Sequence, residues 1–358
     1  MNKNIIRWYK NAGQPFRVAY SFLLFSVCLI LCLVQTVQAQ TAILEYKFNE
    51  TGNTAPSTGS DVTAVTLRNT SGVATDLHSA DSLGVSGGLT GDRAFDNTAS
   101  TSMGGDGGRA DQSVLAAIDT LTSFTLQGWF KTAGSTAVGG GSKAVLLHNT
   151  SGSGVGQVGF QLYGDSNNLN LAVDNANAST SGYADTQSWV FFAVTYDGGS
   201  TSNNVKFYKG SASSEVTLVS TKTINNEQVG NDTVGLGIGN QSGVAGDALS
   251  NPNDNPFDGY LDNIRIYGSQ GDSSGVLTLA QLESIRAGDV PPNVSSTSPA
   301  NGDVGVSVNT TITATFSEAM DASTITTTTF TVSTGGSNIS GTVSYNSTTK
   351  TATFTPSS

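Results

Sequence analysis

One strand-like segment carries a carboxylate where an apolar side chain is expected. In DGYLDNIRIYGS, residues 258–269, strict alternation places Asp262 on the face of Ile264 and Ile266, opposite Arg265. A buried carboxylate is costly unless it is paired. Either backbone N–H groups and an arginine satisfy Asp262, or a bound cation does, and the residue pattern leaves both interpretations open.

The loop before this strand is rich in oxygen ligands. SNPNDNPFDG, residues 250–259, contains Asp254 and Asp258 together with three asparagines. Hard oxygen ligands at close spacing suit Ca²⁺. The spacing is not that of an EF-hand, and Asn-Pro turns use the same residues for local reasons. The loop therefore predicts a candidate calcium site, with a hydrogen-bonded turn as the alternative.

A carbohydrate site would need an exposed aromatic ring with polar neighbours. In SFTLQGWF, residues 123–130, alternation places Gln127 and Trp129 on the face opposite the apolar core positions. Neighbouring segments also place polar and aromatic side chains opposite their core positions. These side chains line one groove if their strands share a sheet, which alternation alone does not decide. Trp189 is expected in the core. The predicted ligand-binding residues are Trp129, Gln127, Gln161, Tyr163, Asn170 and His148.

Signatures of catalysis are weak. The six glutamates are scattered, and no strand offers the two carboxylates about 5 Å apart that retaining glycoside hydrolysis needs. Residues 84–88 match the GxSxG pattern of a nucleophile elbow, but the surrounding pattern is not strand–turn–helix. His78 and His148 lack a metal-ligand spacing. We therefore expect no catalytic residues in this chain.

Residues 1–39 have the pattern of a secretory signal peptide, with an uncleaved membrane anchor as the alternative. Four cations precede the apolar run SFLLFSVCLILCLVQTV, and Val-Gln-Ala ends the segment. Its removal changes the net charge from −11 to −15 and takes away both cysteines. An acidic, disulfide-free exported chain favours a bacterial secreted or cell-surface protein. We expect no nucleic-acid partner and no membrane insertion after cleavage.

Short alternating segments separated by Gly, Asn and Asp turns are typical of an all-β sandwich or jelly roll. One helix is predicted over 278–288, where Thr278 and Gln281 form a capping box and Gly288 ends it. Pro291 and Pro292 mark a linker. The predicted strands lie within residues 42–48, 123–130, 143–148, 158–164, 169–175, 189–199, 205–210 and 234–240.

Threonine-rich alternation beyond the prolines predicts a second, smaller β domain. Its strands are expected within residues 310–321, 329–332, 341–346 and 351–356. The predicted organisation is a signal peptide at 1–39, a jelly-roll domain at 40–288, a linker at 289–293 and the second domain at 294–358.

Two stretches resemble known families. Residues 42–288 resemble laminin-G-like, concanavalin-A-like jelly-roll domains, through LEYKFNETG, SFTLQGWFK, SWVFFAVTYDGG and FDGYLDNIRIYGS in that order. Residues 293–358 resemble the bacterial Ig-like domain of surface-layer and adhesin proteins, through SPANGDVGVSVNTTITATFSEAMD. Members of the second family continue for about two more strands, which implies a truncated and incomplete sandwich here.

The first resemblance implies two curved sheets that bind glycans or proteins, often with calcium. It also implies a structural calcium at an aspartate near the last strand, which points to Asp262 with help from Glu45 on the first strand or from backbone carbonyls. The predicted function is non-catalytic recognition of an extracellular glycan by the jelly-roll domain, with the Ig-like domain as spacer. The alternatives are a structural adhesin or surface-layer component that binds a surface protein, and an accessory part of a larger glycan-degrading enzyme.

Overall fold

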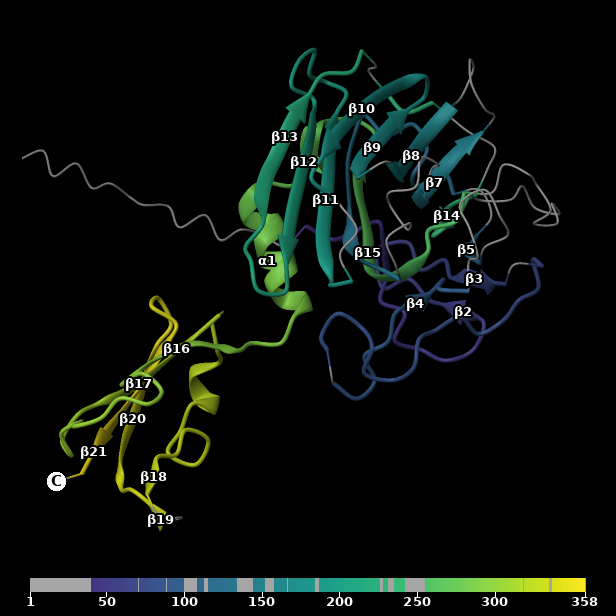
Figure 1. Ribbon diagram of the computed structural model, residues 1–358. Coiled ribbons are helices and arrows are strands. Elements are labelled where there is room, and N and C mark those ends of the chain that lie inside the picture. Colours follow the sequence, from purple (N-terminus) through teal and green to yellow (C-terminus); the bar gives the residue numbers. More distant parts are fainter. Residues whose placement is uncertain are drawn as a thin grey trace, which may run out of the picture. The chain divides into compact units, whose positions relative to one another are not determined.

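The computed structural model shows an all-β protein, which confirms the predicted fold class (Figure 1). The structure describes residues 40–69, 71–87, 89–99, 108–112, 115–133, 144–151, 158–165, 167–183, 187–225, 228–230, 235–241, 255–317, 319–334 and 337–357. The predicted signal peptide lies outside these ranges. Within them, no helix is both long and apolar enough to span a membrane.

Two antiparallel sheets form the larger β region. Sheet A has the order β1-β15-β6-β11-β12-β13, with β4 also paired to β15. Its strands are β1 (Leu44–Tyr46), β15 (Gly259–Ser269), β6 (Ser123–Thr132), β11 (Val190–Asp197), β12 (Val205–Ser211), β13 (Thr217–Lys222) and β4 (Phe95–Asp96).

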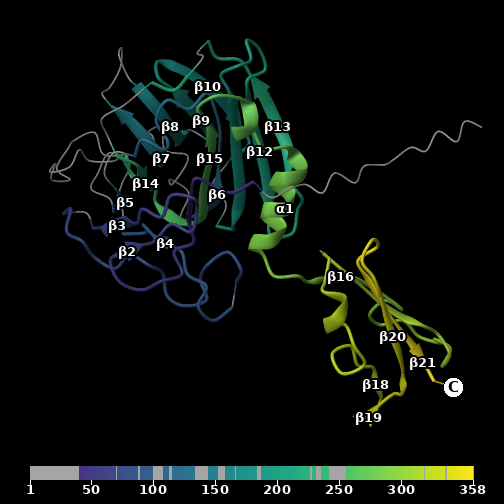
Figure 2. The same cartoon turned by 180° about the vertical axis from the view of Figure 1, so that it is seen from behind.

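Sheet B has the order β10-β9-β8-β7-β14-β5-β3-β2. These strands follow one another side by side in both views (Figures 1 and 2). They are β10 (Ala176–Ser181), β9 (Asn168–Val173), β8 (Val158–Asp165), β7 (Ala144–Ser151), β14 (Gly237–Ile238), β5 (Arg109–Asp111), β3 (Val65–Arg68) and β2 (Thr54–Ala55).

The main core lies between the two sheets. Apolar residues of one face of each sheet form a single buried cluster, in which the rings of Phe124 on β6 and Phe160 on β8 are 5.4 Å apart. Alternation along the strands produces these inner faces, as predicted. The edge strands β10 and β13 were not predicted, because their polar sequences ANASTS and TLVSTK carry little apolar periodicity.

Helix α1 (Leu279–Asp289) packs on the outer face of sheet A, after the short helix η1 (Ser273–Gly275). Both bonds of the predicted Thr278–Gln281 capping box are present. Leu282 of α1 joins a second buried cluster with Trp129 and Phe191 of sheet A. Strand β11 is therefore apolar on both faces, because each face is covered. The helix does not end at Gly288 but includes Asp289, which was predicted to begin the linker.

The C-terminal region has its own four-stranded sheet in the order β16-β17-β21-β20, here named sheet C. The predicted strands 341–346 and 351–356 are confirmed, whereas 329–332 forms no strand. Among its described residues, the buried hydrophobic side chains are Ala314, Ala352 and Phe354. Its elements are β16 (Val294–Ser298), β17 (Ile312–Phe316), β21 (Thr351–Pro356), β20 (Gly341–Asn346), helix η2 (Ala322–Thr324) and the hairpin β18 (Ser333–Thr334) with β19 (Ser337–Asn338).

Candidate functional site

Asp262 does not share a face with the isoleucines of β15, so the alternation argument was wrong at this residue. Asp262 pairs with Trp129 of β6, whereas Arg265 pairs with Gln127, so one extra residue lies on β15 between these pairs. Asn263 takes the positive φ of 47° within this β-bulge. Asparagine tolerates that conformation better than most residues. The bulge turns Asp262 to the outer face of sheet A, opposite Ile264 and Ile266.

A glycine on the neighbouring strand fits this bulge. A Cβ atom at Gly128 would lie 2.5 Å from Cδ1 of Ile264, closer than real carbon contacts. Gly128 therefore allows β15 to bulge against β6 without a clash. The sequence feature that could have revealed the bulge is this pair, an asparagine within an alternating strand and a glycine in its partner.

Asp262 is fully buried and is satisfied by backbone donors. The N–H of Val85 donates to Oδ2 at 2.8 Å, and the N–H of Asn263 donates to Oδ1 at 2.7 Å. Burial raises the pKa of Asp262 well above its usual value, and the negative charges of Asp92 and Asp289 raise it further, against these two hydrogen bonds. Of the two interpretations from the sequence, the one with backbone N–H donors describes this carboxylate. The arginine that it also included is not a partner of Asp262.

The residues around Asp262 do not fit a calcium ion. Two backbone N–H donors bind the carboxylate, and no cluster of three or more His, Cys, Asp or Glu in the described ranges could hold a metal. Asp258 lies directly before β15, and Asp254 lies outside the described residues. Calcium in that loop therefore stays a prediction.

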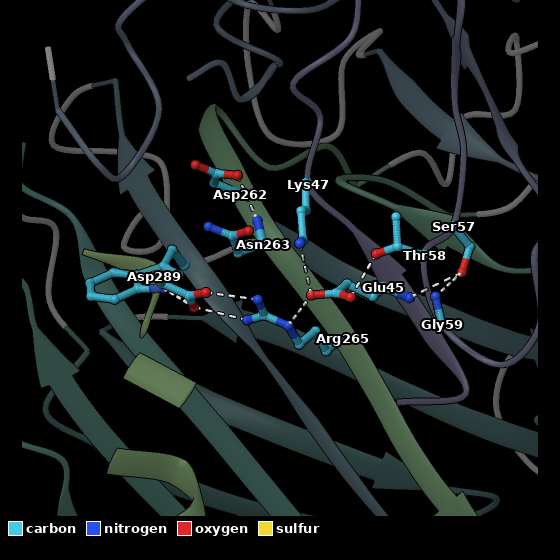
Figure 3. Close-up of polar contacts among 10 residues, drawn as sticks. Glu45, Lys47, Ser57, Thr58, Gly59, Asp262, Asn263, Arg265 and Asp289 are labelled. Atoms are coloured by element: carbon cyan, nitrogen blue, oxygen red, sulfur yellow. Dashed lines mark hydrogen bonds and ion pairs between the residues drawn. The ribbon is translucent and has the colours of Figure 1, made fainter. Parts of the chain in front are cut away.

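Glu45 belongs to an ion-pair network rather than to Asp262. Arg265 donates through Nε to Glu45 at 2.7 Å and through both Nη atoms to Asp289 at 2.8 and 2.7 Å (Figure 3). Burial raises the pKa of Glu45, but a hydrogen bond from Thr58 and the charge of Arg265 outweigh it, so the pKa is lowered. Three carboxylate–guanidinium contacts thus join β1, β15 and the end of α1.

Trp129 and Gln127 do not line an open groove. Both are fully buried on the outer face of sheet A, and Trp129 Nε1 donates to Asp289 at 2.9 Å. Their strand belongs to sheet A, whereas the other four predicted ligand residues belong to sheet B. The six residues therefore do not line one groove, because their strands do not share a sheet. Sheet membership depends on long-range pairing that alternation does not report.

The other four predicted residues share the outer face of sheet B. His148 pairs with Gln161, and Tyr163 pairs with Asn170, so each pair projects to the same side. The apolar neighbours of these residues belong to the core cluster on the opposite side. Gln161 is 2% exposed and its Nε2 has no hydrogen-bond partner. We name His148, Gln161, Tyr163 and Asn170 the polar face.

Sequence reasoning missed a charged cluster beside the polar face. Arg68 Nε donates to Asp111 Oδ1 at 2.8 Å, and Arg109 Nε donates to Asp111 Oδ2 at 2.5 Å. Strand β5 places Arg109 and Asp111 on the outer face of sheet B, because Ala110 between them lies in the core. The alternation in RAD was the available signal, but three residues are too few to predict a strand.

A partly exposed aromatic pair lies at one end of sheet A. The ring centroids of Trp189 and Tyr260 are 6.4 Å apart, and Lys131 Nζ lies 5.6 Å from the centroid of Tyr260. Trp189 was predicted as a core residue, yet it only borders the cluster beneath α1 and stays half-buried. The sequence predicted an exposed aromatic ring at Trp129. Among the described residues, the tryptophan that is partly exposed is Trp189 instead.

Comparison with known proteins identifies one family within the chain. Residues 288–358 match the family described as Bacterial Ig-like domain. This agrees with the predicted second domain. No curated protein matches the chain.

Solved structures give distant likenesses. The binding domain of Paraclostridial Mosquitocidal Protein 1 has a TM-score of 0.42 and 12% identity, over 69% of this chain and 52% of that one. The binding domain of Botulinum neurotoxin serotype G has a TM-score of 0.41 and 11% identity, over 68% and 50%. The Ruminococcus gnavus IT-sialidase CBM40 has a TM-score of 0.34 and 15% identity, over 48% and 85%. This chain thus spans about half the length of the first two structures, and these scores carry no argument about its site.

Proposed function

We propose that the protein is a non-catalytic binding protein that recognises extracellular carbohydrate through the polar face of sheet B. The observation that carries the proposal is the shared projection of His148, Gln161, Tyr163 and Asn170 to one side, with Gln161 Nε2 buried and unpartnered. A buried amide without a partner is costly, and a ligand oxygen would offset that cost. Sugar hydroxyl groups supply both donors and acceptors for polar side chains of this kind.

The same proposal places the protein outside the cell. The signal-like segment at 1–39 and the bacterial Ig-like match at 288–358 support secretion or display at a cell surface. In this proposal the Ig-like region is a spacer. The protein is then expected to release no reducing sugar ends from any polysaccharide that it binds.

The experiment is a binding screen of the secreted chain against glycans and polysaccharides, followed by Gln161→Ala and Asn170→Ala. Each loses hydrogen bonds worth about 0.5–1.5 kcal/mol, so affinity should fall by about two- to tenfold. Thr217→Ala on the exposed strand β13 is the matched control and should bind as the wild type does. Absence of glycan binding, or equal binding by all variants, would reject the proposal.

A protein partner is the alternative, and one observation favours a place for it. The edge strand β13 exposes Leu218 and Val219, at 49% and 36%. An unpaired edge with apolar side chains can pair with a strand of another protein. Leu218→Lys would abolish such an interaction and leave glycan binding unchanged.

A further inference from the structure

The solvent-accessible part of the outer face of sheet B lies at its edge strand β10. Asn177, Ser179 and Ser181 of β10 are exposed, and they alternate with Ala178, which belongs to the core cluster. They therefore project to the same side as the polar face. Further into the sheet, Gln161 is only 2% exposed. A ligand can reach the polar face from the β10 edge, because the side chains there are accessible to solvent.

One row of side chains crosses the sheet from this edge. Ser179 pairs with Asn170 of β9, and Asn170 pairs with Tyr163 of β8. Neighbouring strands are about 4.8 Å apart, so the row extends about 10 Å from Ser179 to Tyr163. Tyr163 is half-buried, and Asn170 between the two is 9% exposed. We name Ser179, Asn170 and Tyr163 the tyrosine row.

The tyrosine row combines an aromatic ring with short polar side chains. An aromatic ring can contact the apolar C–H face of a sugar, while amide and hydroxyl groups exchange hydrogen bonds with its hydroxyl groups. Gln161 lies two residues before Tyr163 on the same face of β8, so its unpartnered Nε2 borders the row. The row therefore joins the polar face to the accessible edge with side chains that suit a sugar.

The charge beside the tyrosine row is negative. Strands β8, β9 and β10 contain no lysine or arginine. Asp165 follows Tyr163 on the same face of β8 and is half-buried. Burial raises the pKa of Tyr163, and the negative charge of Asp165 raises it further. The net charge of the chain is also negative, at −11.

The cations on the flanks of this region have partners of their own. The two arginines that bind Asp111 belong to β3 and β5, which β7 and β14 separate from β8. Lys209 of sheet A donates to the carbonyl of Gly182, beyond the end of β10, and lies 5.7 Å from the ring centroid of Tyr183. An anion on the tyrosine row would therefore face Asp165 without a lysine or arginine of β8, β9 or β10 to bind it.

We propose that the polar face selects uncharged glycans, which bind along the tyrosine row from the β10 edge. The ring of Tyr163 contacts one face of a sugar, and Asn170 and Ser179 hydrogen-bond to its hydroxyl groups. Asp165 disfavours glycans that carry carboxylate or sulfate groups. The inference rests on the proposed carbohydrate function, and it adds the ligand class and a binding residue on the edge strand.

The test compares neutral glycans with oxidised forms of the same glycans. The probes are pullulan, galactomannan and laminarin, each before and after oxidation of its primary hydroxyl groups to carboxylates, and the protein is the whole secreted chain. At low salt, the oxidised form of a polymer that binds should bind about two- to fivefold more weakly than the native form. High salt should reduce this difference, because it screens charges near the surface. Asp165→Asn should reduce it as well.

Further variants test the tyrosine row itself. Tyr163→Ala removes the ring and should weaken binding of the native polymer about 2- to 10-fold, whereas Tyr163→Phe should retain most of the affinity. Ser179→Asp adds a negative charge at an exposed position and should weaken binding of the oxidised polymer further. Glu215→Gln removes an exposed negative charge between β12 and β13 and should behave like the wild type. Thermal melting checks that each variant is folded.

The outcomes separate the two proposals. Equal or tighter binding of the oxidised polymers, or a difference that persists in full in Asp165→Asn, would overturn the uncharged ligand class and leave the carbohydrate function standing. Unchanged binding by both Tyr163→Ala and Ser179→Asp would overturn the tyrosine row as the place of binding. If the glycan screen and all six polymers show no binding, the proposed function and this inference are both rejected.

Discussion

The outer faces of sheets A and B use polar residues in opposite ways. On sheet A, Arg265, Asp289 and Glu45 satisfy one another, and α1 covers the face. On sheet B, no described helix packs against the outer face, and Gln161 remains without a partner. Gln127 on the outer face of sheet A also lacks hydrogen-bond partners, so the two faces differ in what covers them and not in the presence of an unpartnered amide. The comparison therefore assigns stability to the outer face of sheet A, and the proposed function assigns recognition to the outer face of sheet B.

The contacts of the sequence motif around Asp262 resemble those of the rest of the outer face of sheet A. Its carboxylate receives two backbone N–H groups and lies within a fully buried region. The nearby Arg265 binds Asp289 through two contacts and Glu45 through a third. These contacts connect the first strand, the last strand and the helix of the larger β region, so they secure its closure.

Asp289→Ala should give the largest effect on stability and none on binding. Removal of Asp289 leaves the buried Arg265 with Glu45 as its remaining carboxylate partner, and the loss of one partner of a buried pair costs up to about 3–5 kcal/mol. Trp129 Nε1 also loses its acceptor. Urea unfolding would measure the loss, with glycan affinity measured in parallel at a temperature where the variant is folded.

A paired substitution controls for this loss. In Arg265→Met with Asp289→Leu no buried charge of the pair remains, so most of the lost stability should return. A loss below about 1 kcal/mol for Asp289→Ala would show that the network is solvated and that the stability assignment of this face is wrong.

Asp262 should make stability depend on pH in the direction opposite to an ordinary ion-paired carboxylate. Its pKa is raised in the folded state, so the folded protein binds this proton more tightly than the unfolded chain. The stability that comes from this proton is complete below about pH 3.8 and falls as the pH rises toward the folded pKa. The fall is about 1.4 kcal/mol for each unit of the raised pKa.

The measurement is the difference in unfolding free energy between wild type and Asp262→Asn from pH 3.5 to 8. The wild type should lose stability relative to the variant as the pH rises, whereas effects of Glu45 and other carboxylates cancel in the difference. The same samples test calcium. A melting temperature that rises with millimolar Ca²⁺ in the wild type, but not in Asp262→Asn, would contradict the description of Asp262 as a carboxylate held by backbone donors.

Thr278→Ala tests whether α1 is needed to cover sheet A. The side chain of Thr278 accepts from the N–H of Gln281 at 3.3 Å, and loss of such a cap costs about 1 kcal/mol. Thr278→Ser should restore the cap. Hydrogen exchange should become faster in α1 and leave sheet B unchanged. Equal acceleration in both places would show that the two outer faces are not independent.

Much of the fold followed from alternation, because inner-face residues of β6, β8 and β9 repeat with the period of a strand. The helix also followed from its capping box. Edge strands with polar sequences did not, since their side chains bury little apolar surface. The end of α1 was placed one residue too early because Gly288 was interpreted as the stop signal, whereas the helix includes Asp289, whose carboxylate pairs with Arg265.

The candidate site was predictable only strand by strand. Alternation placed His148, Gln161, Tyr163 and Asn170 opposite the core, and the sheet brings these four together. It also selected Trp129, which belongs to the other sheet. Pairings between strands more than a hundred residues apart, such as β6 with β15, decide which outward side chains meet. No local pattern contains that information.

Substitutions of two buried glutamines should have the smallest effects, but they test the comparison of the two outer faces most directly. Gln127 lies on the outer face of sheet A with both amide atoms unpartnered, and Gln161 lies on the outer face of sheet B with Nε2 unpartnered. Leucine has a similar size and no polar atoms, so Gln127→Leu should raise stability by about 1 kcal/mol and leave binding unchanged. Gln161→Leu should have a similar or smaller effect on stability but should weaken glycan binding several-fold. If Gln127→Leu weakens binding instead, or Gln161→Leu does not, then the outer face of sheet A contributes to recognition and the division between the two faces is wrong.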